Sequence, residues 1–227
     1  MERLILFAKR PRHGQVKTRL APALGHDAAL ALYAAFLADS VRLVLSLPDR
    51  PALELCLDGP WTPDLGPVPH PGLTLTEQAP GDLGQRLLRA FDRSHRGGAA
   101  RTVLIGSDSP TLPPDRLSAA FGALRGGADL VVAPAEDGGY VLIGMRAPLP
   151  ELFGEVPWGQ AGVMEATRRR AADLGLAIAE LPGLYDVDDP AGLERLREEL
   201  ADPEVARRAC DTARVLTQLD GPYRTVL

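Results

Sequence analysis

Three acidic motifs in this sequence are candidates for binding a metal ion or a sugar. Gly106-Ser107-Asp108-Ser109-Pro110 and Asp186-Val187-Asp188-Asp189-Pro190 each follow an apolar segment, and Glu136-Asp137-Gly138-Gly139-Tyr140 lies between two such segments. Carboxylates at the ends of buried strands suit Mg²⁺, which typically takes one or two protein carboxylates together with phosphate oxygens. The first and last motifs therefore offer a pair of metal ligands, and Asp137 could accept hydrogen bonds from sugar hydroxyls.

Each acidic motif also has a purely structural interpretation. Asp108 could cap the helix expected at 114–125, and at least one aspartate of 186–189 could cap the helix that follows it. The paired glycines at 138–139 are typical of a hairpin turn, which their spacing alone favours. If 186–188 is extended, Asp186 and Asp188 lie on the same side of the chain, so either could be the second metal ligand.

A basic loop at 9–19 follows the first apolar segment and carries five lysines and arginines, although the whole chain has a net charge of -5. A local positive loop on an acidic protein is unlike the broad basic face of a nucleic-acid binder. The loop indicates either a receptor for a di- or triphosphate or a solvated basic turn. Val16 precedes Lys17 where a Walker A loop requires glycine, and no G-x-G-x-x-G motif follows the first strand, so neither phosphate motif is encoded.

Composition predicts one α/β domain with a buried core. The chain has 227 residues, of which 45% are hydrophobic and 24% charged. The two cysteines form no C-x-x-C pair, the histidines show no zinc spacing, and no run of about 18 consecutive apolar residues is evident. We therefore expect a cytoplasmic protein without a membrane or nucleic-acid partner.

Predicted strands and helices alternate along the chain. Because most strands are continuous apolar runs, they predict a mostly parallel sheet covered by helices on both faces. Ligands of such sheets bind beyond the carboxyl ends of the strands, where the basic loop and the acidic motifs fall. The expected strands are 3–8, 53–57, 73–77, 102–106, 129–133, 140–144 and 177–181, and the expected helices are 27–47, 83–95, 114–125, 162–174, 191–200 and 203–219.

In this order, the motifs resemble the nucleotide-diphospho-sugar transferase (GT-A-like) superfamily. More narrowly, they are similar to the bacterial DUF2064 family, also described as radical-SAM/selenodomain-associated transferase type 1. The resemblance implies a three-layer α/β/α sandwich with a mixed, mostly parallel sheet, in one domain over 1–227 with a C-terminal helical extension at about 203–219. The matching stretches are 7–20, Gly81-Asp82-Leu83-Gly84-Gln85-Arg86, 106–110, 134–140 and 186–188.

The resemblance also implies roles for individual residues. Lys17, Asp108 and Asp188 would be catalytic, with Mg²⁺ or Mn²⁺ bound by Asp108 and Asp188 and with Asp186 as the reserve ligand. The implied nucleotide- and phosphate-binding residues are Lys9, Gly14, Lys17, Thr18, Arg19, Gly84 and Arg86. The implied substrate-binding residues are Asp137, Gly138, Gly139 and Tyr140.

The implied activity is that of a transferase with a nucleotide-activated donor and a small-molecule acceptor. Two reactions stay open: glycosyl transfer of the GT-A type, and nucleotidyl transfer that releases pyrophosphate, as in sugar-phosphate or phospholactate guanylyltransferases. The Asp-x-Asp motif of glycosyltransferases is absent around Asp108, which leans towards the nucleotidyl arrangement. A non-catalytic nucleotide-binding domain is a third alternative. Trp158 would either cover the acceptor or pack in the core, and a monomer and a homodimer are both open.

Overall fold

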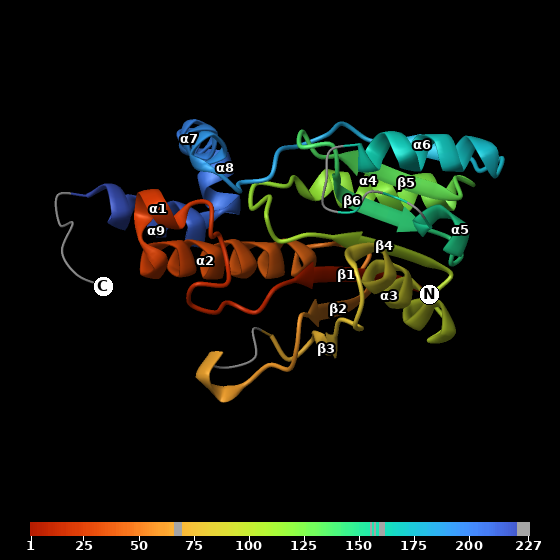
Figure 1. Cartoon of the computed structure of the whole chain (residues 1–227), viewed down its shortest axis with the longest axis horizontal. Coiled ribbons are helices and arrows are strands. Elements are labelled where there is room, and N and C mark those ends of the chain that lie inside the picture. Colours follow the sequence, from red (N-terminus) through yellow and green to blue (C-terminus); the bar gives the residue numbers. More distant parts are fainter. Residues whose placement is uncertain (66–69, 155, 157, 159–161, 222–227) are drawn as a thin grey trace.

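A computed structural model describes residues 1–65, 70–154, 156, 158 and 162–221 (Figure 1). Within this part of the chain, one seven-stranded sheet has the order β3-β2-β1-β4-β6-β5-β7. Strand β6 is antiparallel to β4 and β5, and the other neighbouring pairs are parallel, so the sheet is mixed as expected. The strands are β1 (Glu2–Ala8), β2 (Ala52–Leu57), β3 (Thr74–Glu77), β4 (Arg101–Ile105), β5 (Leu130–Pro134), β6 (Tyr140–Met145) and β7 (Ile178–Glu180).

The helices differ from the predicted set at three places. The short helices α1 and α5 were not predicted, because four residues are too few to show helical periodicity. The helix expected at 203–219 is two helices, separated at Ala209, whose φ of -103° and ψ of 50° are not helical. The helices are α1 (Ala21–Leu24), α2 (His26–Leu45), α3 (Leu83–Arg96), α4 (Pro114–Arg125), α5 (Pro150–Phe153), α6 (Val163–Asp173), α7 (Pro190–Glu199), α8 (Pro203–Arg208) and α9 (Cys210–Asp220), with a 3₁₀ turn η1 at Pro63–Leu65.

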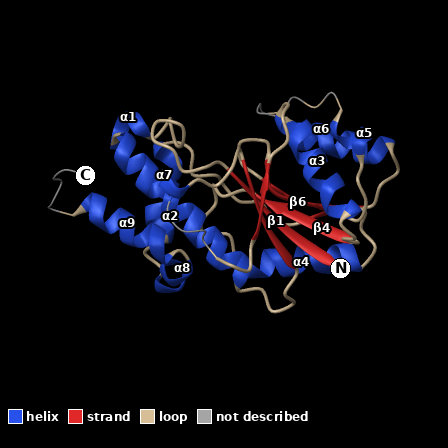
Figure 2. Cartoon of the chain, turned by 90° about the horizontal axis from the view of Figure 1, so that it is seen from below, coloured by secondary structure: helices blue, strands red, loops and turns tan. Residues whose placement is uncertain are grey.

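Helices cover both faces of the sheet, as the apolar strands require. Leu4 and Leu6 of β1 pack in one core with residues of α2 and α4, whereas Ile5 packs in the other core with residues of α3, α5 and α6. This alternation is what a strand that is buried on both faces produces. The result is the expected three-layer α/β/α sandwich (Figure 2).

The parallel register aligns the carboxyl ends of the central strands. Ala8 of β1 lies opposite Leu57 of β2, and Leu6 lies opposite Ile105 of β4. The antiparallel β6 begins at the same edge, directly after the β5–β6 turn. The basic loop and the motifs around Asp108 and Asp137 therefore emerge side by side, as the alternating pattern predicted.

Helix α2 extends beyond the sheet and supports the C-terminal helices (Figure 1). It is long and apolar enough to cross a membrane by length and composition, and an 18-residue stretch of it has a mean hydropathy of 1.7. In the fold, however, 56% of this stretch is buried. Some of its residues pack in the core shared with α4, and others pack in a further core outside the sheet. Phe36 of α2 packs with Leu196 of α7 and Leu216 of α9 in a third apolar core outside the sheet.

A buried carboxylate joins α2 to α9. Asp39 is buried and accepts hydrogen bonds from the backbone N–H groups of Asp211 and Thr212, at 3.1 and 2.8 Å. Its charge is balanced by Arg42 at 2.6 Å. Asp39 thus caps the beginning of α9 from another helix, where a negative charge is favourable.

We predict that Asp39→Asn destabilises the protein by about 2 kcal/mol, because hydrogen bonds to a buried charge are among the stronger ones. Urea unfolding of the variant and the parent protein measures this difference. Asp49→Asn is the matched control, since the carboxylate of Asp49 is 59% exposed in its pair with Arg125. Equal losses in the two variants would contradict the role of Asp39.

Candidate functional site

The site is centred on a buried ammonium between two carboxylates. Lys17 forms ion pairs with Asp108 and, at 2.9 Å, with Asp188. The Lys17 side chain is 2% exposed, whereas those of Asp108 and Asp188 are 43% and 50% exposed. The ammonium therefore contacts the carboxylates from the protein side, and their other faces are open.

Local structure holds Lys17 in this place. Its φ is +46°, a left-handed conformation that non-glycine residues rarely adopt, and its carbonyl accepts the N–H of Leu20 at 2.9 Å as the chain enters α1. Its Nζ lies 6.0 Å from the ring centroid of Tyr33 and 5.2 Å from that of Phe36, both in α2. Such contacts with ring faces stabilise a cation.

Lys17 stays charged despite its burial. Burial by itself lowers the pKa of the ammonium, but the charges of Asp108 and Asp188 and their hydrogen bonds outweigh this effect, so the pKa lies above its ordinary value. The centre of the site is therefore a permanent positive charge.

A backbone hydrogen bond brings the two carboxylate segments together. The N–H of Val187 donates to the carbonyl of Asp108 at 2.9 Å. The capping interpretation of Asp108 does not hold, because the N-cap of α4 is Pro113 and no side chain caps that helix. In the last motif, the cap is Asp189, which accepts the N–H of Gly192 at 2.9 Å. Asp108 and Asp188 are thus left for the site.

Lys17, Asp108 and Asp188 together form an ion triple. Asp186 lies beside this ion triple and does not contact Lys17. Its Oδ1 accepts a hydrogen bond from the Ser109 hydroxyl at 2.8 Å. Burial raises the pKa of Asp186 to about 6, against the effect of the Ser109 hydrogen bond and with the help of the charges of Asp108 and Asp137. Of the two aspartates predicted as alternative second ligands, Asp188 is the one that shares a cation with Asp108.

A cavity of about 530 Å³ adjoins the ion triple. It lies against the carboxyl-terminal parts of β1 and β4 and the first residues of β6, and it reaches the beginning of α3. Asp108 belongs to its wall and so links it to the ion triple. The polar wall is formed by Lys9, Gln78, Asp82, Arg86, Ser107 and Asp108, and the apolar and aromatic wall includes Phe7, Leu83, Leu87, Leu104, Tyr140 and Trp158.

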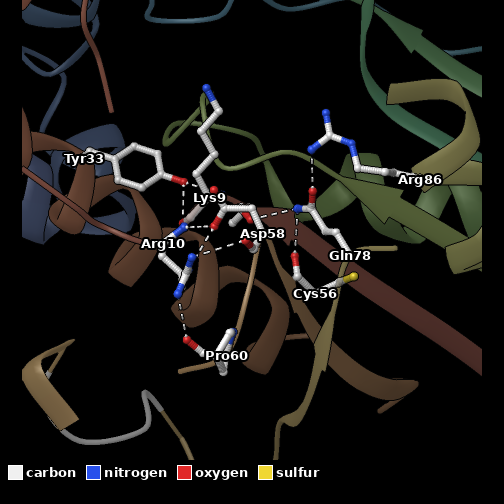
Figure 3. Close-up of polar contacts among 9 residues, drawn as sticks. Lys9, Arg10, Tyr33, Cys56, Asp58, Pro60, Gln78 and Arg86 are labelled. Carbon is white, nitrogen blue, oxygen red and sulfur yellow. Dashed lines mark hydrogen bonds and ion pairs between the residues drawn. The ribbon is translucent and has the colours of Figure 1, made fainter. Parts of the chain in front are cut away.

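Gln78 positions the arginine of this cavity (Figure 3). Its side-chain amide donates to the carbonyls of Ala8 and Cys56, at 2.9 and 3.3 Å, and so joins the ends of β1 and β2. Its Oε1 accepts a hydrogen bond from Arg86 at 3.0 Å. The Nε of Arg86 is buried, and the described residues offer it no acceptor. Sequence reasoning missed Gln78, although it directly follows β3 at the edge where ligand-binding residues were expected.

Two side chains of the basic loop, Arg10 and His13, contact acidic residues elsewhere in the fold. Arg10 donates from its backbone and its guanidinium to Asp58, at 2.7 and 3.4 Å, and thereby holds the segment after β2 (Figure 3). His13 lies 3.1 Å from Asp27. Lys9 has an exposed side chain that lines the cavity and points away from the other labelled side chains of Figure 3. Among the described residues of the loop, Lys9 is therefore the lysine placed for a ligand in the cavity.

Tyr33 connects the basic loop with the Asp108 loop. Its buried hydroxyl accepts the N–H of Lys9 at 2.8 Å and lies 3.1 Å from the hydroxyl of Ser107. Burial, reinforced by the charge of Asp108, raises the pKa of Tyr33, so the hydroxyl keeps its proton. The sequence showed Tyr33 only as part of the apolar face of a helix, and no pattern marked its hydroxyl.

The motif at 136–140 forms the turn between β5 and β6, as its paired glycines favoured. Asp137 accepts the N–H of Gly139 at 2.9 Å, and Gly138 has a φ of +93° that suits glycine. Next to this turn, Trp158 stacks on Phe153 with ring centroids 5.7 Å apart and meets Tyr140 edge-on at 6.2 Å. Trp158 thus packs with core residues, as one of its two interpretations predicted, and it also lines the cavity.

The structure gathers only some of the predicted residues at the cavity. Lys9, Arg86, Asp108 and Tyr140 line it, Gly84 lies directly beneath Trp158, and Lys17 and Asp188 adjoin it through Asp108. Gly14, Thr18 and Arg19 are exposed residues of the basic loop that do not line the cavity. The predicted residues Asp137, Gly138, Gly139 and Asp186 also lie outside its lining.

The donor set of Asp108 and Asp188 fits a divalent metal. Each carboxylate contacts Lys17 through Oδ1, which leaves Oδ2 for another ligand on the exposed side. Two protein carboxylates are the usual share for Mg²⁺ when phosphate supplies further oxygens. Within the described residues, a group of three potential metal ligands occurs at Asp39, Cys210 and Asp211, but there Asp39 is already bonded to α9 and Arg42.

Comparisons with known proteins agree with this architecture. Residues 44–160 match the model of the family described as "Uncharacterized protein conserved in bacteria (DUF2064)". The chain belongs to this family. A solved structure from Desulfovibrio desulfuricans G20, provisionally described as a nucleotide-diphospho-sugar transferase, is 31% identical over 96% of this chain and 95% of its own, with a TM-score of 0.86. A search of the curated proteins finds no match.

More distant structures share the fold alone. CMP:2-keto-3-deoxy-manno-octonic acid synthetase complexed with CTP is 13% identical, covers 89% of this chain and 100% of its own, and has a TM-score of 0.54. A cytidylyltransferase from Leptospira borgpetersenii is 11% identical, covers 100% of this chain and 98% of its own, and has a TM-score of 0.55. The DUF2064 chain therefore has the predicted nucleotide-diphospho-sugar transferase fold.

We predict that the effect of Gly84→Ala on stability depends on the residue at position 158. A Cβ at Gly84 would collide with the indole of Trp158, so the substitution should destabilise the parent protein by about 1–3 kcal/mol. In a Trp158→Leu background, the same substitution should be neutral or stabilising by up to about 1 kcal/mol, because alanine favours a helix over glycine. Thermal unfolding of the four proteins measures both effects, and equal effects in the two backgrounds would contradict the close contact.

We predict that Asp186→Asn makes the protein less sensitive to pH. The pKa of Asp186 is about 6 in the folded protein and 3.8 ordinarily, so folding favours the protonated form and stability falls as the pH rises through this interval. Asparagine can still accept the Ser109 hydrogen bond without this loss. The variant should gain stability over the parent between pH 4 and 7.5, by at most about 3 kcal/mol. A stability difference that does not vary with pH in urea unfolding would contradict this assignment.

Proposed function

We propose that this DUF2064 protein is a metal-dependent transferase with a nucleotide-activated donor, of the nucleotide-sugar kind. The observation that carries the proposal is the meeting of Lys17, Asp108 and Asp188 at the rim of a cavity at the carboxyl edge of the sheet. The relative from Desulfovibrio, provisionally described as a nucleotide-diphospho-sugar transferase, supports this class of donor.

The cavity suits the nucleoside part of the donor. Its apolar floor and the aromatic side chains of Tyr140 and Trp158 offer contacts to a flat base and a ribose. Lys9 and Arg86 give the same cavity two positive charges for the attached phosphates, and Gln78 fixes the direction of Arg86. The donor would thus lie with its base in the cavity and its phosphates towards Asp108.

Asp108 and Asp188 would hold Mg²⁺ or Mn²⁺ through their exposed oxygens. When bound, such an ion neutralises charge on phosphate oxygens. The chain itself contributes preorganised charge: Lys17 holds the two carboxylates together and oriented, and Lys9 and Arg86 stabilise the negative charge of the leaving phosphate. Transfer then requires an acceptor on the open side of the carboxylates, near the β5–β6 turn.

Glycosyl transfer is the first candidate reaction, because the relative from Desulfovibrio is provisionally described as a nucleotide-diphospho-sugar transferase. In this reaction the acceptor attacks the anomeric carbon and a nucleoside diphosphate leaves. Nucleotidyl transfer is the second, in which a sugar phosphate or similar acceptor attacks the α-phosphorus and pyrophosphate leaves. The second is favoured by one observation, namely that the β4 loop supplies a single carboxylate and the other comes from the distant loop at 188. The two reactions release different products.

The test incubates the protein with metal and either nucleotide sugars or nucleoside triphosphates plus sugar phosphates, and the products are identified by mass spectrometry. We expect nucleoside diphosphate release from one nucleotide sugar, and at least a hundredfold loss of rate in Asp108→Asn, since such charged contacts contribute several kcal/mol to catalysis. Asp173→Asn, an exposed carboxylate at the end of α6, is the matched control and should keep full activity. Pyrophosphate as the product would select the second reaction, and equal rates in the two variants would contradict the site.

A further inference from the structure

The metal site proposed above already contains a cation, the ammonium of Lys17. Lys17 neutralises part of the charge of Asp108 and Asp188, so these three side chains together carry a net charge of about -1 rather than -2. A divalent ion bound through the free carboxylate oxygens would also be repelled by the ammonium on the opposite side.

Lys17 is not placed to move away when a metal arrives. Its side chain is 2% exposed, and its ammonium is enclosed by the rings of Tyr33 and Phe36 as well as by the carboxylates. The carboxylates, in contrast, are about half exposed and accessible from the other side. The lysine is therefore a fixed part of the site and not a mobile substitute for a metal.

We infer that Lys17 is a resident cation that makes metal binding depend on phosphate. The carboxylate pair alone holds a divalent ion weakly, and the phosphates of a nucleotide supply the missing negative charge, so that metal and phosphate bind together. This inference rests on the proposed function, because it takes Asp108 and Asp188 as the metal ligands. It adds a regulatory consequence: free metal does not occupy the site before the donor.

A different role for Lys17 gives the opposite result. If the ammonium served only to position the carboxylates, its removal would let them spread apart and metal binding would weaken. If it acted as a resident cation, its removal would leave two uncompensated carboxylates, and metal binding would strengthen. The sign of the change in affinity therefore distinguishes the two roles.

The experiment measures Mn²⁺ binding by electron paramagnetic resonance in the absence of any phosphate. We expect Lys17→Met, which keeps the length and apolar character of the side chain, to bind Mn²⁺ about tenfold more tightly than the parent protein, within the usual range of coupling between two sites. Lys9→Met is the matched control, because Lys9 belongs to the same loop but is exposed and contacts neither carboxylate; its affinity for Mn²⁺ should be unchanged. Equal or weaker binding by Lys17→Met would overturn the inference.

A second measurement uses the parent protein and tests the dependence of metal binding on phosphate even if Lys17→Met does not fold. Pyrophosphate is titrated calorimetrically into the protein, alone and as its Mn²⁺ complex, and we expect at least about tenfold tighter binding of the complex. Tight binding of Mn²⁺ alone, with no gain from pyrophosphate, would overturn the inference. Asp108→Asn separates this failure from failure of the proposed function: if Mn²⁺ binding does not depend on Asp108, the metal site itself is wrong.

Discussion

The burial of one ammonium group between two carboxylates is the constraint on which the site depends. A charged group inside a protein is costly unless it is paired, and Lys17 finds its partners in segments 91 and 171 residues away along the chain. The sheet must therefore bring the ends of β1 and β4 side by side, and the chain must return after β7 to the same edge. The hydrogen bond from Val187 to the Asp108 carbonyl fixes that return at the level of the backbone.

Helix α2 connects the Lys17 site with the C-terminal helices. Its Tyr33 and Phe36 form the protein side of the Lys17 site, and one turn further along, Asp39 binds the beginning of α9. The C-terminal helices, which contribute no residue to the cavity lining, thus pack on the helix that encloses the ammonium. A substitution in the third apolar core, between α2, α7 and α9, could therefore alter the Lys17 site by shifting α2, without changing Asp108 or Asp188.

The sequence allowed the layers, most elements and the main carboxylates to be predicted, because each depends on local patterns. Apolar runs mark β1 and β4, and an aspartate directly after a buried strand marks Asp108 as a residue of the ligand-binding edge. The sequence could not show that Lys17 turns inward: its φ of +46° and its enclosure by α2 depend on tertiary packing. For the same reason the roles of Tyr33 and Gln78 were missed, since their hydrogen bonds join strands and loops that are distant in sequence.

In the function proposed above, the nucleoside and the phosphates are bound by different parts of the site, and this separation is compatible with both candidate reactions. The cavity around Tyr140 and Arg86 can hold a nucleoside whichever bond is broken, and the ion triple lies beyond it, where the phosphates would be. Glycosyl and nucleotidyl transfer differ in which atom the acceptor attacks, so they differ in where the acceptor stands relative to the carboxylates. The charges of Asp108, Asp137 and Asp188 all act on Asp186, so the β5–β6 turn and the segment around Asp186 lie close to these carboxylates. Under the proposed function, we therefore expect the geometry of these residues, rather than that of the cavity, to select between the two reactions.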